Sequence, residues 1–83
     1  MAETTQETGV NMLADALPAQ IKRVQEKRER WAEYQRMCPG ADFRLGMAMM
    51  QSEIDEGIAA LASGDVARMI RAHEDLAANS DDD

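Results

Sequence analysis

The chain has 83 residues, of which 30% are charged, and its formal net charge is −7. This length allows one domain at most, and the acidic balance argues against a general affinity for nucleic acid, since phosphate binding needs a clustered positive surface. The lone Cys38 excludes an internal disulfide, no apolar run approaches membrane-spanning length and no secretory signal opens the sequence, so we expect a cytoplasmic protein without a membrane segment.

Both ends of the sequence are polar, and we expect them to lie outside the folded domain. Residues 1–9 contain no anchoring apolar residue after Ala2, and residues 79–83 form a polar run that finishes in three aspartates. Such segments bury too little apolar surface to offset the entropy of ordering them. The sequence therefore predicts a disordered N-terminal tail (1–9), a helical domain (10–78) and an acidic disordered C-terminal tail (79–83).

The first predicted helix runs from about Pro18 to Met37. Proline suits the first turn of a helix, where its missing N–H has no partner in any case, and Pro39-Gly40 ends the helix. Arg28 lies on the row of this helix that faces inward. A guanidinium there needs a counter-charge or a route to water, so we expect Arg28 to pair with an acid of the second helix or of another chain. The inward row follows an alternating spacing of four and three residues: Leu17, Ile21, Val24, Arg28, Trp31, Gln35 and Cys38.

The second predicted helix runs from about Asp42, its expected N-cap, to Ser63, and it is apolar on two sides. A helix of this kind must be covered twice, by its own chain or by another one. We expect the third helix to cover the broad face, and the first helix or another subunit to cover the strip, where Glu53 and Glu56 lie near Arg28. The broad face comprises Phe43, Met47, Met50, Ile54, Ile58 and Leu61, and the shorter strip comprises Leu45, Met49 and Ala60.

The third predicted helix runs from Val66 to about Ala78. Gly64 suits the left-handed position after the second helix, and Asp65 suits the N-cap of the third. This short link places the second and third helices in an antiparallel hairpin. No run alternates in polarity as a strand would, so the fold class is all-α, a small domain of two long helices and one shorter helix. The residues predicted to be buried on the third helix are Val66, Met69, Ile70, His73, Leu76 and Ala77.

The residues that most often carry catalysis or bind metals are sparse. His73 is the only histidine and lies on the predicted apolar face of the third helix. One histidine and one cysteine are too few for a zinc site, and Cys38 is interpreted as a small apolar residue at the end of a helix. The sequence therefore predicts no enzyme, no metal site and no cofactor.

The first helix carries a basic row of Arg23, Lys27 and Arg30, with Trp31 and Tyr34 beside it. Glutamates interleave with these residues at spacings typical of a solvated helix face. The sequence leaves open whether the row is an interaction surface or only solvated. An acidic protein partner is favoured over nucleic acid.

These features favour a small acidic helical protein–protein interaction module, an adaptor or stoichiometric regulator that acts as a homodimer without catalysis. Its partners would be itself and an unidentified protein. Proteins of this size and composition are often encoded by bacteriophages or prophages, an association that no motif here supports. The alternative is a nucleic-acid-associated regulator that uses the basic face of the first helix. The expected interface residues are Leu45, Met49, Glu53, Glu56, Arg28, Trp31 and Tyr34.

Overall fold

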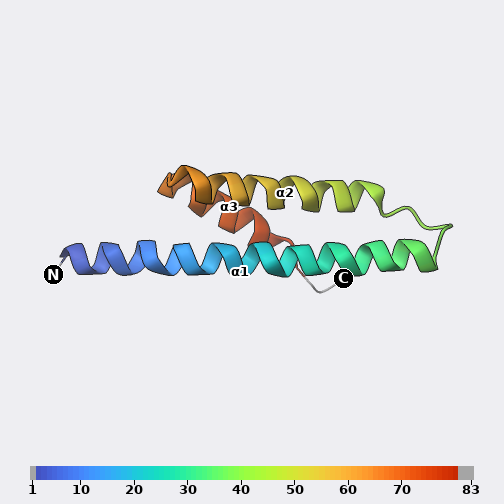
Figure 1. Ribbon diagram of the computed structural model, residues 1–83, viewed down its shortest axis with the longest axis horizontal. Helices are drawn as coiled ribbons and strands as arrows, with labels where there is room; N and C mark the ends of the chain where they lie inside the picture. The colour runs from blue at the N-terminus through green and yellow to red at the C-terminus, as the bar shows by residue number, and fades with distance from the viewer. Residues whose placement is uncertain (1, 81–83) are drawn as a thin grey trace.

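The computed structural model describes the backbone of residues 2–80 and the side chains of residues 12–80. Its three helices are α1 (Ala2–Met37), α2 (Arg44–Ser63) and α3 (Val66–Ala78). α2 runs antiparallel to α1, and α3 then returns beside both in the direction of α1 (Figure 1). The predicted all-α fold of three helices, with α2 and α3 in an antiparallel hairpin, is confirmed.

α1 is longer than predicted, because it begins at Ala2 and continues through Pro18. A proline inside a helix removes one backbone hydrogen bond and crowds the preceding turn. The neighbouring Leu17 and Ile21 are buried against the other helices, and this packing holds the backbone helical on both sides of the proline. Once a helix exists, adding residues costs little, and the backbone of residues 2–9 continues α1. This end of α1 projects beyond α2 and α3 (Figure 1).

The connection between α1 and α2 is held by a glutamine. The Gln35 side chain donates to the Ala41 carbonyl oxygen at 2.7 Å and accepts from the Phe43 amide at 2.8 Å. Gln35 therefore satisfies loop backbone groups, which explains a polar residue in the inward row of α1. Phe43, and not Asp42, occupies the N-cap of α2, although the Asp42 carboxylate accepts the Arg44 amide at 3.0 Å.

The turn between α2 and α3 matches its prediction. Gly64 ends α2 in the left-handed region at φ 70°, where a residue with a Cβ would be strained. Asp65 is the N-cap of α3, and its carboxylate accepts the Arg68 amide at 3.3 Å. The bounds of α3 are those that the sequence predicts.

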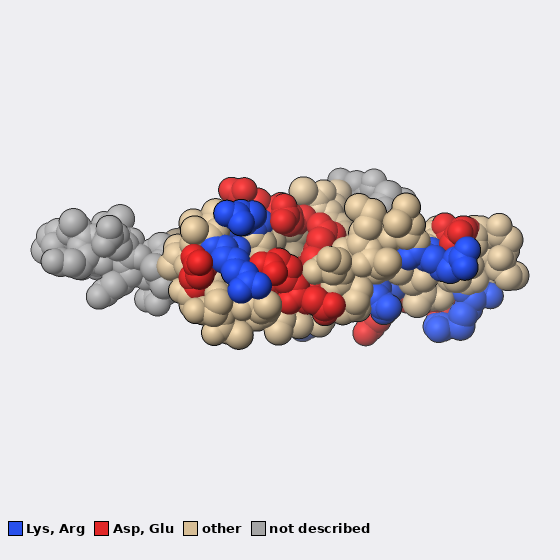
Figure 2. Space-filling model, turned by 90° about the horizontal axis from the view of Figure 1, so that it is seen from above, with Lys and Arg blue, Asp and Glu red and all other residues tan. Residues whose placement is uncertain are grey.

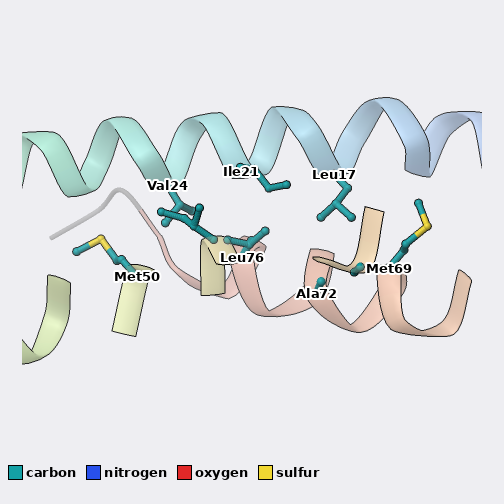
Figure 3. Packing of buried hydrophobic residues seen from close by; sticks show 9 residues of the cluster. Leu17, Ile21, Val24, Met50, Met69, Ala72 and Leu76 are labelled. Atoms are coloured by element: carbon teal, nitrogen blue, oxygen red, sulfur yellow. The ribbon is translucent and has the colours of Figure 1, made fainter. Parts of the chain in front are cut away.

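The core lies along the middle of α1, where all three helices meet. Figure 3 shows Leu76 of α3 directed toward α1 near Ile21 and Val24, with Met69 and Ala72 nearer Leu17. The buried apolar residues are Leu17, Ile21 and Val24 of α1, Met50, Ile54 and Ala60 of α2, and Met69, Ala72 and Leu76 of α3.

The buried face of α2 is rotated from its predicted position. Ile58 is exposed, whereas Gly57 and Ala60 are buried. A Cβ added to Gly57 would lie 3.0 Å from Ile21 Cγ1, so α2 approaches α1 closely at this glycine. Ala60 therefore belongs to the covered face, and the predicted strip is reduced to Leu45 and Met49.

The buried face of α3 is also rotated from its predicted position, again because a small residue is buried where a larger one was expected. Ala72 is buried, Val66, Ile70 and Ala77 are exposed, and His73 is partly buried. Small residues let helices approach each other, so a pattern that weights only large apolar residues places the buried face too far to one side.

Candidate functional site

α3 is shorter than the two helices it packs against. Its C-cap, Asn79, lies beside Lys27 of α1 and Glu53 of α2. α1 continues from there to Met37 and α2 begins at Arg44, so both helices extend about 15 Å past the end of α3 at about 1.5 Å per residue. Beside the end of α3, side chains of α1 and α2 line a hollow that we call the open groove, and the connection between α1 and α2 marks its loop end.

The closed end of the open groove is a polar junction of three helices. Lys27 is only 4% exposed, and its Nζ donates to Asn79 Oδ1 at 2.7 Å and to the Ser80 carbonyl oxygen. Asn79 Nδ2 donates to Glu53 Oε1 at 3.0 Å. One asparagine therefore joins α1, α2 and α3. Asn79 and Ser80 are hydrogen-bonded parts of the domain, where the sequence predicted a disordered tail.

Arg23 completes this junction one turn earlier on α1. Its Nη2 donates to the carbonyl oxygens of Leu76 and Asn79, both at 2.8 Å, and its Nε donates to Gln20 Oε1 at 2.9 Å. The last carbonyls of a helix lack partners within the helix and carry partial negative charge, so a guanidinium there is favourable. Arg23 and Lys27 of the predicted basic row are therefore engaged with the end of α3, a role that the sequence did not indicate.

The floor of the open groove is built on Trp31. A Cβ at Gly46 would lie 2.4 Å from Trp31 Cζ3, so glycine is what allows the indole to lie against α2. The Trp31 and Phe43 rings meet edge to face at 5.5 Å, and Lys27 Nζ lies 5.4 Å from the Trp31 ring centre. The hollow measures about 310 Å³ and is lined by Lys27, Trp31, Gly46, Met49, Met50, Glu53, Asp75, Ala78 and Asn79.

The walls of the open groove are apolar where α3 is absent. On α1, the row that holds α3 continues at helical spacing to Tyr34, 48% exposed, and Met37, 68% exposed. On α2, the row that contains Glu53 continues to Met49, 59% exposed, and Leu45, 75% exposed. Of the predicted interface residues, Trp31, Met49 and Glu53 line the hollow, and Tyr34 and Leu45 follow at helical spacing along α1 and α2 toward the loop end. The sequence did not single out Met37.

Two predicted interface residues lie elsewhere. Glu56 forms an ion pair with Arg68 of α3, with oxygens 2.7 and 2.9 Å from the guanidinium nitrogens, and this pair lowers the pKa of Glu56. Glu53 hydrogen-bonds to Asn79 and Glu56 pairs with Arg68, so the expected proximity of these acids to Arg28 stays a prediction. Arg28 Nε is buried and has no hydrogen-bond partner among the described residues, so pairing of Arg28 with a second chain stays a prediction.

Charge is divided along the molecule. Residues 28–49, which form the loop end, contain four basic residues and three acids, a net charge of +1, so the remaining residues carry a net charge of −8. Figure 2 shows acidic side chains gathered over the middle of the molecule, with Lys and Arg prominent at the loop end. The Asp42–Arg44 pair at this end lowers the pKa of Asp42 to about 2.

Comparison with protein-family models, curated proteins and solved structures found no match for this chain. Within residues 2–80, no helix combines the length and apolar character needed to cross a bilayer. The same residues hold no cluster of three or more His, Cys, Asp or Glu side chains able to bind a metal ion. The absence of catalysis and of a cofactor stays a prediction.

Proposed function

We propose that the chain is a small acidic helical interaction module, an adaptor or stoichiometric regulator of another protein, that acts as a homodimer without catalysis. The open groove is the observation that supports this function. Met49 lines the hollow, and the exposed Tyr34, Met37 and Leu45 follow at helical spacing along α1 and α2, whereas isolated exposed apolar residues would need no explanation. A continuous patch of this kind marks an interaction site in soluble proteins.

The extent of the patch fits a specific interface. Side chains of this size present about 200 Å² each, so Tyr34, Met37, Leu45 and Met49 together leave on the order of 500 Å² exposed. A standard interface covers about 800 Å² on each partner. Trp31, Glu53 and Asp75 line the adjoining hollow and would add to the contact.

Sedimentation equilibrium of the double variant Leu45→Glu/Met49→Glu tests this function. We expect the wild-type chain to sediment as a dimer and the variant as a monomer of unchanged helix content, because both substitutions place charge in the apolar walls. Ile58→Glu is the matched control, since Ile58 is also an exposed apolar residue of α2 but lies on its opposite side. It should remain dimeric.

Two results would contradict the proposal. A wild-type chain that stays monomeric up to high concentration would remove the homodimer. A dimer that dissociates with Ile58→Glu and persists with Leu45→Glu/Met49→Glu would place self-association on the other side of α2.

A further inference from the structure

We draw no further inference here: the strongest candidate, the patch of exposed apolar side chains along α1 and α2 beside the open groove (Tyr34, Met37, Leu45 and Met49), carries none because nothing in the structure shows what covers it.

Discussion

Two glycines of α2 determine how closely its neighbours pack. At Gly57, an added Cβ would lie 3.0 to 3.2 Å from Cγ1 and Cδ1 of Ile21 and from Cδ1 of Leu76, aliphatic groups that can shift by a few tenths of an ångström. At Gly46, the obstacle is the Trp31 ring at 2.4 Å, a rigid group that must move as a whole. The two glycines therefore look alike in the sequence and differ in what surrounds them.

We expect Gly46→Ala to lower the free energy of unfolding by about 1 kcal/mol. Overpacking costs about 1–3 kcal/mol, and the gain in helix propensity offsets up to about 1 kcal/mol of it. Gly57→Ala is the matched comparison and should change stability less. Urea unfolding followed by circular dichroism measures both, and Trp31 emission should shift only with Gly46→Ala. Equal stability of the two variants would contradict the role assigned to the indole.

The hydrogen bonds at Asn79 could not be predicted from the sequence. Basic side chains on α1 were visible in the sequence, and so was the polar run after α3. Their pairing joins residues more than fifty positions apart, as in the bond from Lys27 to Asn79. No local spacing encodes such a contact, so Lys27 was assigned to a surface row although it is buried.

At the scale of elements, Arg23 holds the last turn of α3. We expect Arg23→Ala to destabilise the protein by about 1.5–3 kcal/mol, the range for hydrogen bonds that involve a charged group, because two carbonyl oxygens lose their donor. Hydrogen exchange should accelerate first in residues 74–79. Arg36→Ala is the control, since the Arg36–Glu33 pair is solvent-exposed and should contribute little. Equal effects of the two variants would argue against the capping role.

Element boundaries were predictable where the backbone itself demands a residue type. Gly64 and Asp65 fixed the hairpin turn and the start of α3. The start of α1 was not predictable from Pro18, because burial of Leu17 and Ile21 outweighs the cost of the proline. The groove was anticipated only in part. The sequence shows that Leu45 and Met49 are apolar residues beyond those that one buried face needs. They are exposed because α3 ends before it reaches this part of α2, which depends on tertiary packing.

At the scale of the whole molecule, the arrangement of charge favours the proposed function over the alternative of nucleic-acid binding. The net charge of −7 per chain becomes −14 in a dimer, twice the single-chain value. Phosphate binding would need a positive surface strong enough to overcome this repulsion. Two of the three residues of the predicted basic row, Arg23 and Lys27, already donate to the end of α3.

We therefore expect no binding of the full chain to a fluorescently labelled DNA duplex, measured by anisotropy at roughly 50 mM salt, where non-specific phosphate contacts are strongest. The Arg36→Ala variant should behave identically, because no phosphate contact is lost. Anisotropy that rises with protein, falls as salt increases and weakens in Arg36→Ala would instead locate a phosphate-binding surface at the loop end. That result would favour the nucleic-acid alternative, since the basic residues of the loop end would then serve a phosphate ligand.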